Sequence, residues 1–458
     1  MQLPRLRSGV VLSLLRRNRD YRLVFLAQVV SFAGDWFATV ALVGLVIDRT
    51  GSDLAATLVW VAASLPSFLV TGLAGPVADR FNRKTIMVTA GFLQAAFASL
   101  FLFGQNGWIG FGFVAQGTIA ALGAFFGPAS SAALPNLVAK EDLATATAIS
   151  GAVWGAMLAV GSALGAVVAQ TFGRRTAFVV DGISFIVSAL LILAIRGSTR
   201  APVDAGASAG ANAKPTARMR PIADTKEAIR YARGNRFVSV FLLSKFGAGL
   251  GTGVVGLLPL LAKREFHAGD AGIGVLLTAR GLGVLLGPFA VRKVDRSGLR
   301  ALVTLSGFGV VLYGLSYLAV PFMPTIALAA VFVFIGHIGG GAQWTGSTLG
   351  LQRSADDSVR GRIMAADFAL ATLSMSLSFA VAGITSTAFG PKPTILGLAV
   401  VEMTWGTFYL WRTRALRGSA LAAEADVTHH RPTDHVTSQT ASFTSPTESP
   451  TEEQSHAL

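Results

Sequence analysis

The sequence predicts an all-α membrane protein with twelve transmembrane helices in two six-helix halves, and three observations support this. Hydrophobic residues make up 52% of the 458 residues and charged residues only 14%, against about 25% charged in ordinary soluble domains. The apolar residues form twelve blocks, each near the roughly 20 residues that a helix needs to cross the bilayer core. A short Gly-Pro pattern at the end of the second block returns at the end of the eighth, as a duplication would produce.

The twelve predicted spans form two groups of six, separated by a long connection. They are 23–47, 54–77, 85–103, 109–127, 146–170, 174–195, 237–262, 271–291, 300–320, 324–347, 363–388 and 393–411. The expected domains are a basic N-terminus (1–22), a first bundle (23–195), a linker (196–236), a second bundle (237–412) and a tail (413–458). The first 22 residues lack the apolar region and cleavage site of a signal peptide, so we expect an uncleaved anchor.

The composition excludes several classes of protein. The chain has no cysteine, which rules out disulfides, thiolate metal sites and cysteine nucleophiles. Its 51 glycines follow no Gly-X-Y period, which rules out collagen. The net charge of +14 does not predict a nucleic-acid partner, because the basic residues flank apolar blocks instead of forming one basic domain.

Lysine and arginine residues predict the side of the membrane that each segment faces. With the N-terminus inside, 30 of the 38 basic residues fall on cytoplasmic segments and 6 on the opposite side, while Lys245 and Arg280 lie within spans. This is the bias of the positive-inside rule. We therefore expect a multi-pass protein of the inner (plasma) membrane with both termini in the cytoplasm.

Two polar segments are expected outside the bilayer. In the linker, 224–233 predicts a short amphipathic helix on the inner membrane surface. The Ser/Thr/Pro-rich tail is predicted to be disordered. Its residues His429, His430 and His435 are candidate metal ligands, but scattered tail histidines are usually solvated, so we expect no metal site.

The connection between the second and third spans carries the most specific motif, Gly-Pro-Val-Ala-Asp-Arg-Phe-Asn-Arg-Lys at 75–84. It is similar to the signature loop of the major facilitator superfamily, with Asn82 in place of the usual glycine. The copy at 287–292 has Val291 in place of the acid. The resemblance implies two pseudo-symmetric six-helix halves, the major facilitator fold, with a substrate site near the midplane.

Four further stretches resemble the drug- and siderophore-exporter branch of that superfamily, which includes macrolide and enterobactin exporters. They are 18–23, 31–36, 135–143 and 359–363, and the resemblance covers about residues 18–412. It also implies a gate formed by the signature loop and the start of the eleventh helix. The expected gating residues are Gly75, Asp79, Arg80, Arg83, Lys84, Arg360 and Arg362.

Two kinds of contact are expected in this gate. Asp79 would accept hydrogen bonds at the positive N-terminus of the eleventh helix. The basic residues of the loop would pair with Asp142 or Asp356 and hold the inner side closed. The alternative is that these basic residues only set the topology.

Five ionisable residues lie deep within predicted spans, where each costs about 2.5–3.5 kcal/mol on insertion scales and therefore suggests a function. They are Asp35, Lys245, Arg280, His337 and Glu402. The resemblance places three of these residues on helices that line the central cavity. We expect Asp35 to bind the coupled proton, paired with Lys245 or Arg280 in one conformation only; a fixed structural ion pair is the alternative.

The other deep residues each have a structural alternative as well. Lys245 would hold an anionic substrate group or extend toward the inner surface. His337 is more simply a hydrogen-bonded structural residue. Glu402, on a helix that the resemblance places at the periphery, is expected to have a structural partner, with Arg280 as the candidate. The polar and aromatic candidates for lining the cavity are Trp36, Gln116, Gln343 and Trp344, which would otherwise face lipid.

Together these features predict a transporter and not an enzyme. The expected function is export of small amphipathic molecules (a drug, siderophore or secondary metabolite) by proton antiport with alternating access. The chain has no phosphate-binding Gly-x-x-x-x-Gly-Lys-[Ser/Thr] loop, so we expect the proton gradient as the energy source, no cofactor, and a monomer. The alternatives are an importer or symporter of a small solute on the same fold, or a membrane accessory protein that transports nothing.

Overall fold

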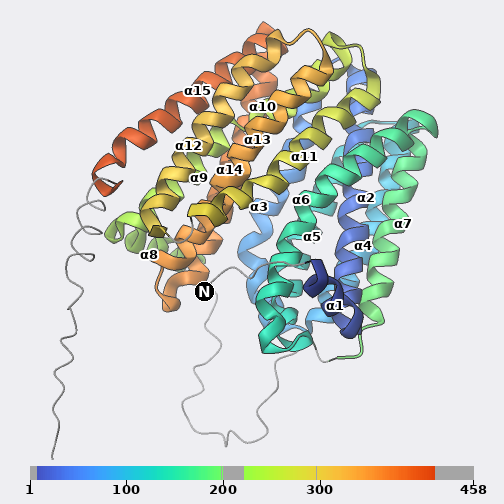
Figure 1. Ribbon diagram of the computed structural model, residues 1–458. Helices are drawn as coiled ribbons and strands as arrows, with labels where there is room; N and C mark the ends of the chain where they lie inside the picture. Colours follow the sequence, from blue (N-terminus) through green and yellow to red (C-terminus); the bar gives the residue numbers. More distant parts are fainter. Residues whose placement is uncertain (1–7, 198, 200–220, 295–296, 418–458) are drawn as a thin grey trace, which may run out of the picture. The chain divides into compact units, whose positions relative to one another are not determined.

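The computed structural model describes residues 8–417 except 198, 200–220 and 295–296 (Figure 1). Within these residues every regular element is a helix. The elements are α1 (Ser8–Arg17), α2 (Arg19–Thr50), α3 (Asp53–Arg80), α4 (Arg83–Asn106), α5 (Gly110–Leu137), α6 (Lys140–Thr171), α7 (Arg174–Leu193), α8 (Pro221–Gly234), α9 (Arg236–Gly251), α10 (Gly253–Leu260), η1 (Leu261–Glu265), α11 (Gly269–Val294), α12 (Gly298–Ala319), η3 (Val320–Phe322), α13 (Ile326–Ser354), α14 (Asp357–Phe389) and α15 (Pro391–Arg412). The three tail histidines lie outside the described residues.

The part of the chain that is described contains eleven helices long and apolar enough to cross a membrane. One of them, Arg236–Glu265, combines α9, α10 and η1. The predicted twelfth span, α15, is not among the eleven; its charged residues Lys392, Glu402 and Arg412 lower its hydropathy. The predicted all-α membrane fold is confirmed, and α15 joins it by packing along α12.

The helices pack in the same order in the two halves of the chain. In the first half, α2 packs against α6 and α7, while α5 packs against α3 and α4. In the second half, α9 packs against α14 and α15, while α13 packs against α11 and α12. Across the halves, α6 lies along α11 and α3 lies along α14 (Figure 1).

Corresponding asparagines begin the first helix of each half. The Asn18 side chain accepts a hydrogen bond from Tyr21 N at 2.9 Å and donates one to Leu137 O, at the end of α5, at 2.7 Å. Asn235 caps α9 in the same way and donates to Ser354 O, at the end of α13, at 3.0 Å. Such a cap satisfies free backbone groups of two helices at once, so the duplication is visible in detail.

The predicted span 237–262 is not one continuous helix. It breaks at Thr252, between α9 and α10, and ends in the π-helical turn η1. Glycine is a poor helix former, and Gly251 and Gly253 flank the break. Pro259 lies in the following turn and cannot donate a backbone hydrogen bond. After the break, the basic residues at the end of the span, Lys263 and Arg264, contact Asp48 and Asp53 of the first half.

We call the face that carries α1 and α8 the terminal face and the opposite one the distal face (Figure 1). At the distal face, ion pairs join the two halves. Arg174 contacts Asp270 at 2.7 Å and Asp48 at 2.6 Å. Lys263 contacts Asp48 at 2.7 Å and Asp270 at 3.2 Å. These four residues form a ring of alternating charge, which we call the distal ring.

A second distal contact between the halves is the pair Arg264–Asp53. The other carboxylate oxygen of Asp53 accepts a hydrogen bond from Ser386 Oγ at 2.5 Å. Arg264 also donates to Gly51 O at 2.7 Å. Thus α3 of the first half is held to both η1 and α14 of the second.

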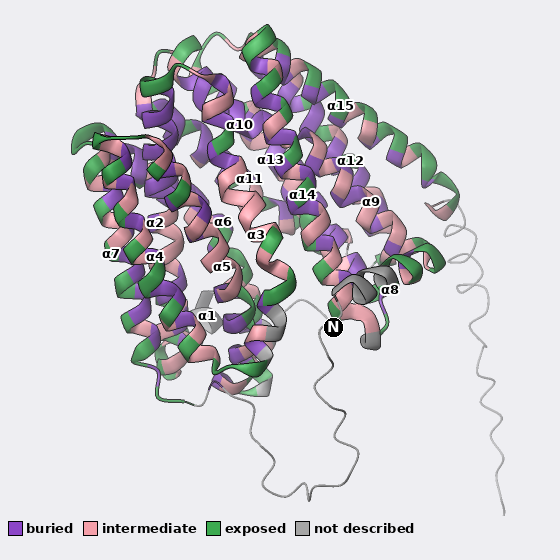
Figure 2. Cartoon of the chain, turned by 180° about the vertical axis from the view of Figure 1, so that it is seen from behind, coloured by how far each residue is buried: buried purple, intermediate pink, exposed green. Residues whose placement is uncertain are grey.

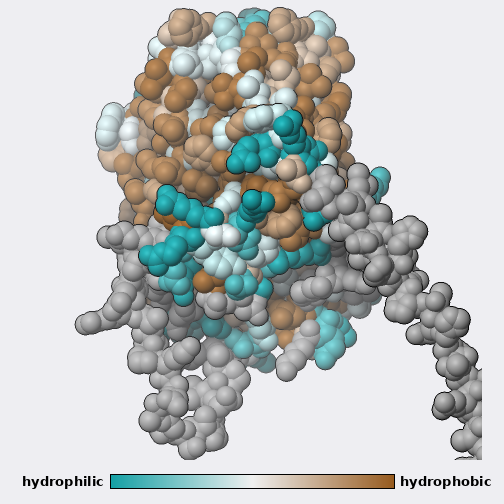
Figure 3. Space-filling view, turned by 90° about the vertical axis from the view of Figure 1, so that its left-hand side faces the viewer, coloured by the Kyte–Doolittle hydropathy of each residue, from teal (hydrophilic) through white to brown (hydrophobic). Residues whose placement is uncertain are grey.

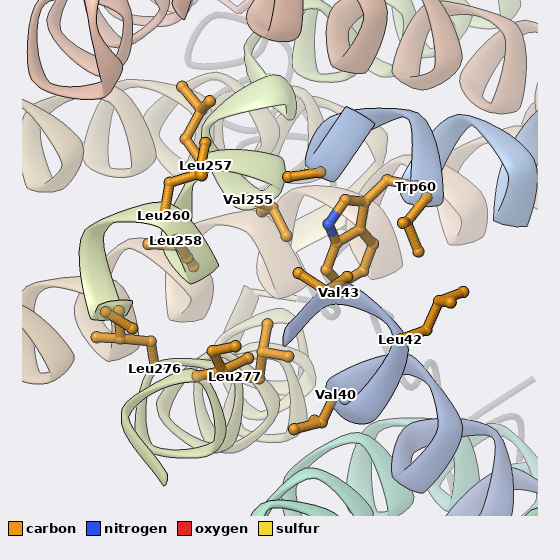
Figure 4. Packing of buried hydrophobic residues seen from close by; sticks show 14 of the residues in the cluster. Val40, Leu42, Val43, Trp60, Val255, Leu257, Leu258, Leu260, Leu276 and Leu277 are labelled. Carbon is orange, nitrogen blue, oxygen red and sulfur yellow. The ribbon is translucent and has the colours of Figure 1, made fainter. Parts of the chain in front are cut away.

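Beneath the distal ring, apolar side chains from both halves form one continuous core. Figure 4 shows Val40, Leu42 and Val43 of α2 and Trp60 of α3 close to leucines of α10 and α11. The buried residues concentrate along the helix contacts (Figure 2), while apolar side chains cover much of the upper part of the face drawn in Figure 3, above a group of hydrophilic ones. An apolar exterior around a packed interior is what a lipid environment requires.

Contacts between the halves thin out toward the terminal face. Along α6, an added Cβ on Gly155 would still lie 3.7 Å from Val284, whereas nothing lies within 4 Å of Gly151. Along α3, Leu69 and Leu73 are 67% and 48% exposed. The halves are therefore closed at the distal face and separate toward the terminal face (Figure 1).

Candidate functional site

The first group of buried ionisable residues is an acid pair between α2 and α7. Asp35 is half-buried on α2, and Asp181 on α7 is 1% exposed. The two carboxylates lie close enough for their charges to repel each other. Neither oxygen of Asp181 has a hydrogen-bond partner among the described residues. Gly34 makes the approach possible, because an added Cβ there would lie 3.0 Å from Asp181 Oδ1 and would overlap Ser184 Oγ.

The second group surrounds Arg280 of α11, which is 7% exposed. Its guanidinium carbon lies 5.7 Å from the ring centre of Trp36 and 5.7 Å from that of Trp60. Tyr313, Tyr317 and His337 lie near enough to interact with its charge. No described residue gives a hydrogen-bond partner to Arg280 Nε or Nη1.

The third group is a buried ion pair between α9 and α14. Lys245 Nζ lies 2.7 Å from Asp367 Oδ2, and the two side chains are 1% and 4% exposed. Lys245 also donates to Thr348 Oγ1 at 2.9 Å and lies 4.0 Å from the ring centre of Trp344. Lys245 therefore already has a partner within its own half in this conformation, and that partner is not Asp35.

Glu402 and His337 take structural positions. Glu402 is 2% exposed and packs against Gly251 of α9. The predicted pair of Glu402 with Arg280 is wrong for this structure, because Oε2 of Glu402 and two guanidinium nitrogens of Arg280 lack partners among the described residues. His337 Nδ1 lies 2.9 Å from Val333 O, within its own helix.

The four candidate lining residues take different environments. Trp36 is buried and packs edge-on against Trp154 at 6.4 Å between ring centres. Gln343 is buried and donates to Ser244 Oγ at 3.0 Å, which fixes it within the second half. Trp344 is 42% exposed and Gln116 is half-buried.

The described basic side chains of the signature loop bind backbone carbonyls in this conformation. Arg83 donates to Ala132 O at 2.8 Å and Thr199 O at 3.1 Å, and Lys84 donates to Ile195 O at 2.8 Å. Asp142 instead pairs with Arg17 at 2.5 Å. Arg83 and Lys84 therefore do not pair with Asp142 or Asp356 in this conformation, whose terminal ends are separated; they bind backbone carbonyls of α5 and of the segment after α7. That such pairs hold the inner side closed stays a prediction.

The remaining gate residues are spread along the terminal face. Arg80 is exposed, Arg360 donates to Ala355 O at 3.2 Å, and Arg362 pairs with Glu227 of α8. The side-chain position of Asp79 lies outside the described part, as does the environment of Gly75.

Two acids of these groups, Asp181 and Asp367, were not predicted from the sequence. Each lies closer to the end of its predicted span than the five ionisable residues that were selected because they lie deep within theirs. A usable signal was available: Asp and Glu are rare anywhere within a transmembrane segment and mark functional candidates even several residues from its centre.

Two similar sets of helices that join at one face, with buried charges inside each set and between them, are the architecture of a membrane transporter with two pseudo-symmetric halves. The sequence comparison gives its family. The chain belongs to the transmembrane secretion effector family of the major facilitator superfamily, whose model matches residues 12–442. This confirms the predicted superfamily, and the family is one of transporters, not of enzymes.

Curated relatives agree with this family. The multidrug efflux pump Tap of Mycobacterium tuberculosis is 27% identical over 426 residues, which is 88% of this chain and 96% of Tap. The staphyloferrin A transporter of Staphylococcus aureus is 22% identical over 86% of this chain and 96% of its own. The MFS-type transporter YkuC of Bacillus subtilis is 28% identical over 59% of this chain, a match that spans 64% of YkuC.

Solved structures share the fold at low identity. A POT family transporter bound to a thioalcohol-conjugated peptide has a TM-score of 0.70 at 11% identity, covering 87% of this chain and 96% of its own. A bacterial homologue of the human lysosomal transporter Spinster, in an inward-facing and unoccupied conformation, has a TM-score of 0.66 at 17% identity, covering 86% and 97%. These likenesses support the fold of a multi-pass membrane transporter.

Proposed function

We propose that this protein exports small amphipathic molecules in exchange for protons, by alternating access between its two halves. It would act as a monomer in the plasma membrane, with the proton gradient as its energy source and no cofactor. The transporter fold, the described contacts and the names of the relatives support different parts of this proposal, and each part can be tested separately.

The direction of opening follows if the distribution of basic residues is used to orient the molecule. The positive-inside bias of the sequence would put the terminal face in the cytoplasm. The distal ring and the pair Arg264–Asp53 would then close the outer side, and the separated terminal ends would admit substrate from the cytoplasm. Loading from the cytoplasm is what an exporter requires, and the relative Tap is named a multidrug efflux pump.

The observation that carries the proton-coupling proposal is the acid pair Asp35–Asp181. Two neighbouring carboxylates repel when both are charged, and no basic side chain pairs with either in the described residues. One proton shared between them would remove the repulsion. If the outward-open state moves α2 relative to α7, the affinity for that proton would change with the conformation, which links proton flow to transport.

The test is uptake of ethidium into everted membrane vesicles with an acidic interior, with and without an uncoupler. We expect uptake that the uncoupler abolishes. Asp35→Asn should lose gradient-driven accumulation but keep exchange of labelled for unlabelled ethidium, because exchange needs no proton movement. Glu141→Gln is the matched control, since Glu141 is an exposed acid on α6.

The outcomes separate the alternatives. Accumulation in Asp35→Asn equal to that of the wild type would refute Asp35 as the coupling site. Loss of gradient dependence in the wild type would indicate facilitated diffusion. Depletion of solute from the vesicles under the same gradient would indicate an importer or symporter.

A further inference from the structure

Within the described part of the chain, Arg280 is a buried cation without a counter-ion, and in this it differs from Lys245. Lys245 has its carboxylate partner 2.7 Å away. Arg280 is 7% exposed, yet its Nε and Nη1 have no hydrogen-bond partner within the described residues. An unpaired charge removed from water is costly unless something neutralises it, so the site lacks a negatively charged component.

The neighbours of Arg280 are mostly aromatic and come from both halves. Trp36 of α2 and Trp60 of α3 lie on one side of the guanidinium. Trp60 in turn stacks on Phe379 of α14 at 5.8 Å between ring centres. We call Arg280, Trp36, Trp60 and Phe379 the aromatic box. Its walls belong to elements that must move relative to one another when the halves exchange sides, which is where a transported molecule has to bind.

The free polar atoms at the box are hydrogen-bond donors. Besides the two nitrogens of Arg280, Trp60 Nε1 has no partner among the described residues. An indole N–H can only donate, and a guanidinium has no acceptor atom. A set of unpaired donors around a positive charge fits an oxyanion, and the planar guanidinium matches a carboxylate or a similar group in two-bond geometry.

We propose that the aromatic box binds the transported molecule and that Arg280 holds its negatively charged group. The substrates would then include amphipathic organic anions, with an aromatic or extended apolar body packed against Trp36 and Trp60, whose ring centres lie 6.3 Å apart, and an oxyanion on Arg280. This proposal rests on the proposed function in that the bound molecule is taken to be the exported one. Binding itself can be measured without transport.

The position of the box fits loading from the terminal face. Arg280 follows Ala279 and precedes Gly281, whose added Cβ would collide with Ala159 of α6. One turn further toward the terminal face, Gly155 and Val284 make one of the last close approaches between these two helices. The box therefore lies just inside the closed part of the interface, within reach of a molecule that enters between the separated ends.

The experiment is binding to purified protein in lipid nanodiscs, measured by quenching of tryptophan fluorescence. The probes are 8-anilinonaphthalene-1-sulfonate, an aromatic anion, and ethidium, an aromatic cation. For Arg280→Gln we expect anion binding about 10- to 100-fold weaker, the range for losing a hydrogen bond to a charged group. Ethidium affinity should stay the same or increase. The anion affinity of Arg280→Lys should lie between those of the wild type and Arg280→Gln, because lysine keeps the charge and loses the planar guanidinium.

Arg292→Gln is the matched control, because Arg292 lies on the same helix, over the ring of Phe289 at 6.0 Å, and is exposed. Its anion affinity should match the wild type. A second readout is the thermal stability of the unliganded protein, which Arg280→Gln should maintain or raise, since it removes an unpaired buried charge.

Three results would overturn the proposal. The first is unchanged anion affinity in Arg280→Gln, and the second is equal loss of anion and cation binding. The third is recovery of anion affinity when Asp35→Asn is added to Arg280→Gln, which would make Asp35 the true counter-ion of Arg280. Anion binding that depends on Arg280 in a protein that moves neither probe in vesicles would instead contradict the proposed export function and leave the binding site standing.

Discussion

The buried pair Lys245–Asp367 offers the sharpest test of the packing in the second half. We would neutralise each partner alone, with Asp367→Asn and Lys245→Met, and then both together. Both side chains are almost fully buried, at 1% and 4% exposure, and lie 2.7 Å apart. Breaking a buried ion pair by removing one partner costs about 3–5 kcal/mol, because it leaves an uncompensated charge.

The surroundings of the pair predict which single change is worse. Asp367→Asn leaves Lys245 with Thr348 Oγ1 at 2.9 Å and the Trp344 ring at 4.0 Å. The ring contact alone contributes about 1–2 kcal/mol, so we expect a loss of about 3 kcal/mol in the free energy of unfolding. Lys245→Met removes these contacts and leaves both oxygens of Asp367 unpaired, since Oδ1 has no partner already; here we expect about 4 kcal/mol.

The double variant has no buried charge, so it should lose much less than the two single variants added together. We expect a coupling energy of at least about 3 kcal/mol, at the upper end for residues in contact. The assay is equilibrium unfolding in mixed micelles of dodecyl maltoside and sodium dodecyl sulfate. Asp142→Asn is the control, because its partner Arg17 is 60% exposed, and exposed pairs contribute about 1 kcal/mol or less. Additive losses, with a coupling below about 0.5 kcal/mol, would refute this reasoning.

Three further predictions concern the interface, the glycines and the charge moved. Replacing Arg174 and Lys263 by Gln removes the four ion pairs of the distal ring. If these pairs stabilise the state that is closed at the distal face by about 2 kcal/mol, their loss should raise the outward-open population about 30-fold. A cysteine placed at Ser64 of α3, whose Oγ lies 2.7 Å from Ser376 Oγ of α14 between the halves, in a chain with no native cysteine, should then react faster with an impermeant maleimide from outside. An unchanged rate would contradict the role of the distal ring in closing the outer side. Gly34→Ala and Gly251→Ala should each destabilise by about 1–3 kcal/mol through overpacking, whereas Gly151→Ala, with nothing within 4 Å, should be neutral or gain up to about 1 kcal/mol; equal thermal shifts would argue against these contacts. Export of one monovalent anion in exchange for one proton moves two charges across the membrane, which corresponds to about 4.6 kcal/mol per 100 mV. A potassium diffusion potential alone should therefore drive transport. A transport rate that does not depend on the potential would exclude that stoichiometry.

Much of the fold was predictable because the bilayer restricts what the chain can do. Backbone groups must be satisfied within each span, so apolar blocks of about 20 residues locate helices almost by themselves. Residues deep in those blocks also proved to be buried in protein: Lys245, Arg280, His337 and Glu402 are all at most 7% exposed. Hydropathy and position within a span therefore predicted burial in the protein without any information about which helices lie next to each other.

Partners were not predictable, because they depend on how each helix is rotated and where it breaks. Asp367 and Asp181 lie closer to span ends than the chosen residues, and only the packing of α14 on α9 and of α7 on α2 brings them to Lys245 and Asp35. The break at Thr252 depends on local glycines that hydropathy treats as neutral. Arg83 and Lys84 bind helix-end carbonyls, which a search for opposite charges does not consider.

The duplication and its decay together explain why the two halves differ in charge. In each half, a glycine of the first helix packs against a buried acid of the sixth helix: Gly34 against Asp181 and Gly251 against Glu402. The next residue is Asp35 in the first half and Thr252 in the second, so the second acid is present only on one side. The second half instead carries the unpaired Arg280. A division follows from this asymmetry, with an acid pair suited to a proton in one half and a cation suited to an anionic substrate in the other. Because Arg280 lies on the second half, whereas the acid pair and the Trp36 and Trp60 walls of the box lie on the first, the two occupancies can be linked through the relative position of the halves without direct contact between proton and substrate.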